Sequence, residues 1–238
     1  MKAILDLHTH TVVSGHAYST VKENIEEAIS KDLKFLGISD HGCSMPGGPH
    51  PYYFNNLYVL PRNVGKIKIL RGIEANIIDY DGNIDVEKET LERLDYAIAS
   101  LHMPCIKFGT KEENTNAILK VMDNEKVKII GHPDDSRYPL DYEVIVKKAK
   151  EKNVLLEVNN SSLNPNSYRE GARNNVFKML ELCEKYKTKI ILGTDSHICY
   201  DIGAFSNCEE ILKVTNFPKE LVINYNENDF IKMFDINF

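Results

Sequence analysis

The chain has 238 residues, a formal net charge of −6, 42% hydrophobic residues and 27% charged residues. This composition is typical of a globular domain, and the acidic balance argues against broad nucleic-acid binding, which needs clustered Lys and Arg. No run of 18 apolar residues is present, so no membrane span is expected.

The N-terminus and the cysteines both bear on the cellular location of the protein. The sequence enters an apolar, strand-like run at once, so we expect no signal peptide. The five cysteines are odd in number and form no C-x-x-C pair, which predicts reduced thiols and a cytoplasmic protein. They are Cys43, Cys105, Cys183, Cys199 and Cys208.

Apolar, β-branched runs alternate with segments of helical periodicity along the whole chain. Strands are predicted at 3–7, 35–39, 66–73, 96–101, 127–131, 154–158 and 190–194, and 221–225 would form an eighth. Helices are predicted at 20–33, where Thr20 and Glu23 form a capping box, and at 112–123, 142–152, 172–186, 205–214 and 229–234. This alternation predicts a single α/β domain over residues 1–238, built as one parallel, TIM-like barrel.

Seven of the eight histidines follow the predicted strands closely. His8, His10 and His16 follow the first strand, and the others lie at or after later strand ends, together with Glu74 and Asp195. Because all C-terminal strand ends of a parallel barrel open on one face, these side chains are expected to meet there. The remaining histidines of this group are His41, His102, His132 and His197, so only His50 is left out.

Neutral imidazoles and carboxylates are the usual ligands of zinc, manganese and iron. A lone histidine at a strand end is more often a packed residue than a ligand, but seven on one rim have no such explanation. Nine candidate ligands exceed the capacity of one site, since a catalytic zinc keeps about three protein ligands. The sequence therefore predicts a polynuclear metal centre, in which Glu74 would be a natural bridge between two ions.

The order of these residues resembles the PHP (polymerase and histidinol phosphatase) superfamily, and within it the YcdX-like phosphatases. The resemblance is carried by HTHTVVSGH, RGIEAN, EVNNSS and LGTDSH, and by FNNLYVLPR after an aromatic loop. It implies a distorted seven-stranded (β/α)7 barrel, a trinuclear centre and hydrolysis of phosphoric monoesters. All nine positions of the family's ligand set are filled, namely His8, His10, His16, His41, Glu74, His102, His132, Asp195 and His197.

The resemblance also implies how the ligands divide. His8, His10 and Glu74, with Asp195, would hold one ion. Glu74, His102 and His132 would hold a second, and His16, His41 and His197 a third, with Asp195 between the first and third. Three divalent ions, with zinc favoured over manganese or iron, would generate a metal-bound hydroxide that attacks phosphorus. Glu74 and Asp195 would then be the catalytic bridging ligands.

Roles around the centre are predicted more loosely. Asp6 and Asp40 are candidates to orient ligand imidazoles. Arg169 is the candidate for gripping a substrate phosphate, since a guanidinium suits phosphate oxygens; Arg62, Arg71 and Arg137 rank below it. The aromatic loop 42–56 is predicted to be an ordinary packed loop rather than a lid over the rim.

Other functions stay open on the sequence. A histidinol-phosphate phosphatase or a PHP-type phosphodiesterase or exonuclease would use the same ligands. Amidohydrolases also begin with H-x-H on a barrel strand, but commonly bridge their metals with a lysine, whereas Glu74 takes that place here. A non-catalytic metal-binding module is disfavoured, because structural sites are usually closed. The expected partner is a small phosphorylated substrate, and binding to long nucleic acid or to a membrane is not expected. The resemblance leaves a homo-oligomer open, because relatives include trimers.

Overall fold

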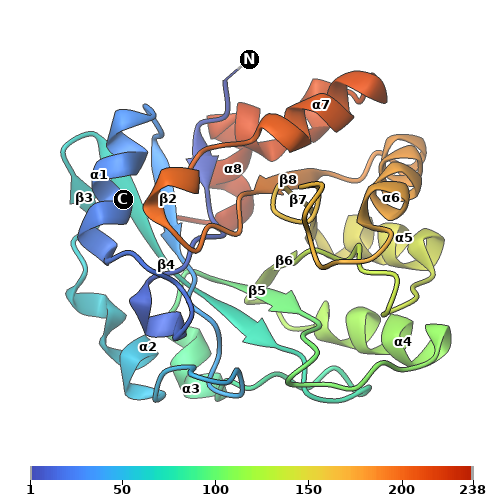
Figure 1. Cartoon of the computed structure of the whole chain (residues 1–238), viewed down its shortest axis with the longest axis horizontal. Helices are drawn as coiled ribbons and strands as arrows, with labels where there is room; N and C mark the ends of the chain where they lie inside the picture. The colour runs from blue at the N-terminus through green and yellow to red at the C-terminus, as the bar shows by residue number, and fades with distance from the viewer. Residues whose placement is uncertain (1, 237–238) are drawn as a thin grey trace.

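The computed structural model describes residues 2–236, in which seven parallel strands form a nearly closed barrel with helices between them (Figure 1). Neighbouring strands pair in parallel in chain order, so the predicted (β/α)7, TIM-like barrel is confirmed. The parallel strands are β1 (Leu5–Asp6), β2 (Phe35–Ile38), β4 (Ile67–Asn76), β5 (Tyr96–Ser100), β6 (Val127–Ile130), β7 (Leu155–Asn159) and β8 (Ile190–Gly193).

The longer helices lie close to their predicted positions and surround the strands in Figure 1. Thr20 forms the predicted capping box with Glu23, and Thr110 forms a second one with Glu113, so that α4 begins a residue earlier than predicted. These helices are α1 (Val21–Ser30), α4 (Lys111–Val121), α5 (Tyr142–Lys152), α6 (Ala172–Tyr186), α7 (Ser206–Val214) and α8 (Glu227–Phe234). None of the helices within residues 2–236 has the length and apolar character needed to span a membrane.

Short elements were missed or wrongly predicted. The sequence did not predict two short helices, α2 (Tyr52–Asn56) and α3 (Lys88–Glu92), or three 3-10 turns, η1 (Val12–Ser14), η2 (Leu57–Val59) and η3 (Cys199–Asp201). It also missed β3 (Asn63–Val64), which pairs antiparallel with β4. The predicted eighth strand at 221–225 is wrong. That segment forms the end of η4 (Lys219–Leu221) and η5 (Ile223–Tyr225), and only Val222 makes a parallel bridge, to Ile190.

The barrel is closed between β1 and β8 by a side chain where strand pairing is missing. Asn224 of η5 accepts a hydrogen bond from the backbone N–H of Leu192 (2.8 Å) and donates to the carbonyls of Leu192 (2.9 Å) and Leu5 (3.1 Å). Nearer the other end, the N–H of His10 donates to the carbonyl of Ser196 (2.9 Å). The side-chain amide of Asn224 therefore connects β1 and β8 in place of the eighth strand predicted at 221–225.

The N-terminal end of the barrel is filled by apolar side chains. Phe230 and Phe234 of α8 pack with Phe35 and Tyr96, the residues that open β2 and β5. The Tyr96 hydroxyl donates to the carbonyl of Leu7 (2.5 Å), and Gly72 leaves room for its ring, because a Cβ there would lie 2.4 Å from the Tyr96 ring. Since this end is plugged, polar chemistry is confined to the C-terminal end of the strands.

Candidate metal centre

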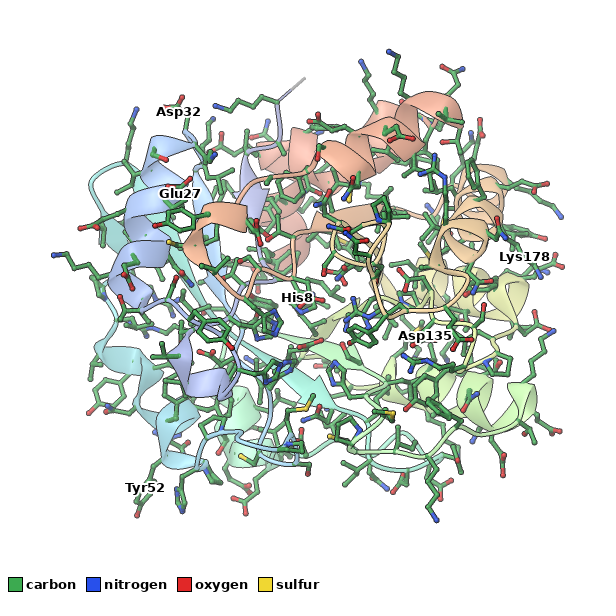
Figure 2. The ribbon with its side chains drawn as sticks, viewed as in Figure 1. His8, Glu27, Asp32, Tyr52, Asp135 and Lys178 are labelled. Atoms are coloured by element: carbon green, nitrogen blue, oxygen red, sulfur yellow. The ribbon has the colours of Figure 1, made fainter. Side chains whose placement is uncertain are left out.

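The backbone brings the nine predicted ligands to the C-terminal end of the barrel. His8 and His10 follow β1, and His41, three residues after the end of β2, makes a parallel bridge with Glu74 of β4. His102 and His132 follow β5 and β6, Asp195 and His197 follow β8, and His16 follows η1. Figure 2 shows the His8 side chain in the middle of the barrel, with Tyr52 and Lys178 at its periphery.

The seven imidazoles form one continuous cluster. His10 lies 4.3 Å from both His41 and His197, measured between ring centroids, and His16 lies 4.9 Å and 4.8 Å from the same two rings. His132 connects the remaining rings, at 5.1 Å from His102 and 5.8 Å from His8. His50, which the sequence left out, instead packs against Tyr52.

The carboxylate of Glu74 lies at the centre of this cluster and is fully buried. Its Oε1 lies 3.2, 3.2 and 2.9 Å from the Nε2 atoms of His8, His102 and His132. Its Oε2 lies 3.4 Å from Nε2 of His10 and 2.7 Å from Nδ1 of His41. One carboxylate therefore faces five imidazoles from four strand ends.

Asp195 is the second carboxylate of the cluster. Its Oδ1 lies 3.5 Å from Nε2 of His8, 3.3 Å from Nε2 of His10 and 3.6 Å from Nδ1 of His197. Its backbone has a positive φ of 55°, which is uncommon outside glycine and is found at functional turns. The position turns the side chain inward, toward the imidazoles.

The donor set fits divalent cations. Within residues 2–236, Nε2 of His8 and His10, Nδ1 of His41 and Oε2 of Glu74 are buried and have no hydrogen bond of acceptable geometry, although oppositely charged groups lie nearby. Buried polar atoms without partners are rare and costly. Four groups of three side chains have ligand atoms within 4.8 Å of one another: His8–His10–Glu74, His8–His132–Asp195, His41–Glu74–His102 and His10–His41–His197.

The pKa shifts also indicate that positive charge belongs here. Burial opposes ionisation of Glu74, yet the imidazoles of His8, His102 and His41 lower its pKa well below the usual value. Burial likewise opposes ionisation of Asp195, but His8 and Arg169 lower its pKa well below normal. Burial and the neighbouring His41 and His197 lower the pKa of His10. Burial opposes protonation of His8, yet Glu157, Glu74 and Asp195 raise its pKa well above the usual value. The ionised carboxylates therefore attract positive charge, which bound metal ions would supply in place of a proton.

Several imidazoles are oriented by hydrogen bonds on the nitrogen that faces away from the cluster. Nδ1 of His8 lies 2.7 Å from Oε1 of Glu157, and Nδ1 of His102 lies 2.6 Å from Oδ1 of Asn76. Such bonds fix the tautomer and direct Nε2 toward a metal. Glu157 and Asn76 were not predicted for this role; the only sequence signal is that each lies on a strand near its C-terminal end.

The predicted orienting residues act differently. Asp6 accepts hydrogen bonds from the Thr194 hydroxyl (2.5 Å) and from backbone N–H groups, so the idea that it orients an imidazole is wrong. Asp40 acts through an intermediate: it accepts from the Ser14 hydroxyl (2.7 Å), whose oxygen lies 3.1 Å from Nδ1 of His10.

The arginines fall into two groups. Arg169 is buried beside the cluster, where it donates to Asp195 Oδ2 (3.0 Å) and Ser162 Oγ (2.9 Å). Arg169 and Arg137 both line a cavity that opens next to the histidine cluster. Arg62 pairs with Asp95, and Arg71 donates to the carbonyls of Tyr58 and Leu60. These last two have structural contacts and do not line that cavity.

The aromatic loop 42–56 is mostly exposed or half-buried, and Met45 and Pro46 line the cavity. Phe54 is buried, and the Tyr53 hydroxyl donates to Asp40 (2.5 Å). These two contacts anchor the loop to the barrel, and its packing rather than action as a lid stays a prediction.

Comparisons with known proteins agree with a metal-binding hydrolase site. The family model described as the PHP domain matches residues 6–161. The chain belongs to the PHP family. A Clostridium botulinum (strain Hall) protein named probable phosphatase is 49% identical over 98% of this chain and 94% of its own length. A probable phosphatase of Clostridium novyi is 50% identical over 97% and 94%. These relatives support the expected enzyme class, a phosphatase-type hydrolase.

A solved structure supports the fold of this PHP protein. The histidinol phosphate phosphatase of Lactococcus lactis, solved with zinc, L-histidinol and phosphate, superposes with a TM-score of 0.61 over 92% of this chain and 95% of that one. At 20% identity this likeness concerns the fold alone.

Proposed function

We propose that this PHP protein hydrolyses phosphoric monoesters with three divalent metal ions held at the C-terminal rim of its barrel. The observation that carries the proposal is Glu74, a fully buried carboxylate facing five imidazoles, with unpartnered donor atoms around it among residues 2–236. A purely structural core has no use for such a cluster, since each unsatisfied buried polar atom destabilises the fold.

Nine residues are proposed as ligands, divided as the family resemblance implies. His8, His10 and Glu74, with Asp195, would hold the first ion, and this grouping agrees with one of the four clusters of donor atoms. His102 and His132 would hold the second with Glu74, and His16, His41 and His197 the third. The other clusters combine residues across these sets, as in His8–His132–Asp195, and the four together contain every proposed ligand except His16. The support for His16 is its ring contacts with His41 and His197.

Zinc is the favoured ion, with manganese or iron as alternatives. Imidazoles and carboxylates suit all three, and the related Lactococcus structure was solved with zinc. When bound, such ions supply activation of water and neutralisation of phosphoryl charge.

The side chains of this chain have separable tasks. Glu74 and Asp195 stay ionised and are the proposed bridging ligands, while Glu157 and Asn76 hold imidazoles in the required tautomer. Arg169 is the proposed phosphate-binding residue, because its buried guanidinium lies beside Asp195 and lines the cavity. A guanidinium fixed in this way contacts phosphate oxygens without first losing conformational freedom.

Further parts of the proposal rest on the sequence. We take residues 1–238 as one domain acting on a small phosphorylated compound in the cytoplasm, without membrane or long nucleic acid, and a homo-oligomer stays open. A phosphodiesterase or a histidinol-phosphate phosphatase would share this centre, so the substrate must decide between them.

The test is hydrolysis of p-nitrophenyl phosphate and bis-p-nitrophenyl phosphate by chelator-stripped protein, before and after addition of Zn²⁺, Mn²⁺ or Fe²⁺. The proposal expects activity to vanish on stripping, to return with metal, and to favour the monoester. A preference for the diester would indicate a phosphodiesterase, and an absence of both activities with every metal would overturn the proposal.

A further inference from the structure

The cavity above the histidine cluster extends well beyond the space that a phosphate needs. It has a volume of about 470 Å³ and is lined, outside the cluster, by loops that follow β2, β5, β6 and β7. Seven of these lining residues are apolar or aromatic: Met45, Pro46, Leu101, Met103, Pro104, Tyr138 and Tyr168. This outer cavity is where the alcohol part of a phosphomonoester would lie.

The charges in the outer cavity are already paired. Arg137 donates through Nε to both oxygens of Asp135 (3.0 Å each) and through Nη2 to Oδ2 (2.5 Å). The two side chains are only 22% and 10% exposed. Such a multidentate, partly buried pair is more rigid than an isolated surface ion pair.

Arg137 is also in contact with two aromatic rings, of which Tyr168 lines the cavity and Phe108 does not. Its guanidinium carbon lies 5.4 Å from the ring centroid of Phe108 and 5.5 Å from that of Tyr168, within the range of cation–π contacts. Tyr168 in turn lies 5.3 Å from the guanidinium of Arg169. The arginine is thereby fixed against its carboxylate and is not offered to a ligand as an uncompensated charge.

Arg169 is also paired, but its partner Asp195 is a proposed metal ligand whose charge bound ions would share, so Arg169 keeps charge for the substrate phosphate. The described residues that line this cavity include no lysine and no further carboxylate. Beyond the cluster, an incoming group therefore meets apolar surface and a neutralised ion pair. A second anionic group on the substrate would lose water there and face Asp135 without a free counter-charge.

We propose that this outer cavity selects phosphomonoesters whose alcohol part is uncharged and apolar, and that Asp135 is the residue that excludes a second anion by neutralising Arg137. This inference rests on the proposed phosphatase function and adds the class of substrate to it.

A pair of substrates that differ by one carboxylate provides the test: phenyl phosphate and 4-carboxyphenyl phosphate, assayed with the metal-loaded protein. The wild type is expected to favour phenyl phosphate by about tenfold in kcat/KM. Asp135→Asn, which leaves Arg137 uncompensated, should reduce this preference about tenfold. Arg137→Met, which leaves Asp135 alone, should increase it. Asp81→Asn removes an exposed carboxylate that does not line the cavity, so it should leave the ratio unchanged.

The two opposite shifts protect the test against a folding defect, because general damage lowers both rates and does not move their ratio in opposite directions. The inference is overturned if Asp135→Asn and Arg137→Met both keep the wild-type ratio, or if the wild type favours the carboxylated ester. If the wild type hydrolyses neither compound with any metal, the proposed function itself has failed.

Discussion

Nδ1 of His8 lies 2.7 Å from Oε1 of Glu157, and both side chains are buried. The second oxygen of Glu157 accepts hydrogen bonds from the backbone N–H of His132 (2.8 Å) and from Asn159 (3.0 Å). His132 has a positive φ of 27°, a conformation that needs support from its surroundings. One carboxylate on β7 thus orients the side chain of one proposed ligand and the backbone of another.

We expect Glu157→Gln to weaken metal binding about 10- to 100-fold. An amide offers one oxygen and one NH₂ group, so it cannot accept hydrogen bonds from both His8 and His132. The measurement is metal content by mass spectrometry after equilibration in chelator-buffered zinc. Glu143→Gln is the control, because it makes the same change at a carboxylate that contacts Lys147 and Tyr186 and no proposed ligand. Equal metal content in both variants would contradict the role assigned to Glu157.

Replacement of Glu74 or His102 by Ala should abolish hydrolysis, by at least about 10³-fold in kcat, while leaving a folded barrel. These side chains contact the cluster and not the apolar end of the barrel, so circular dichroism should stay native-like. His50→Ala is the matched control, since His50 lies outside the cluster, and it should keep wild-type turnover. Near-normal turnover in Glu74→Ala would exclude a bridging function for this carboxylate.

The barrel and the convergence at its rim could be predicted because both follow from local patterns. Apolar runs mark the strands, and in a parallel barrel the C-terminal ends of all strands lie on one face. The segment 221–225 misled the prediction, since Val222 and Ile223 are as apolar as a strand, whereas the side chain of Asn224 makes the contacts. Glu157 was missed for a related reason: its function depends on His8, which lies 149 positions away, and no local spacing reports that proximity.

Arg169→Met should lower kcat/KM for p-nitrophenyl phosphate about 100-fold with full metal occupancy. Met keeps most of the aliphatic volume and removes the charge that we propose contacts the phosphate. The steady-state rates and the metal content are measured on the same sample, because loss of the Arg169–Asp195 pair could otherwise act through metal loss. Arg173→Met is the control, as Arg173 forms an exposed pair with Glu210. Unchanged kcat/KM in Arg169→Met would leave this arginine with a structural function only.

Asn224→Ala should destabilise the protein by about 2–4 kcal/mol and leave the metal centre intact. The substitution removes three side-chain hydrogen bonds and leaves the N–H and carbonyl of Leu192 and the carbonyl of Leu5 without partners in a buried layer, and each orphaned group costs about 1–3 kcal/mol at most. Urea unfolding measures the change, with Asn174→Ala on the exposed face of α6 as a control expected to stay within about 0.5 kcal/mol. Because Asn224 lies near the plugged end of the barrel, kcat of the folded variant should match the wild type. A variant that unfolds at the same urea concentration as the wild type would show that β1 and β8 stay joined without this side chain, through the Thr9–Ser196 bridge and the Asp6–Thr194 hydrogen bonds.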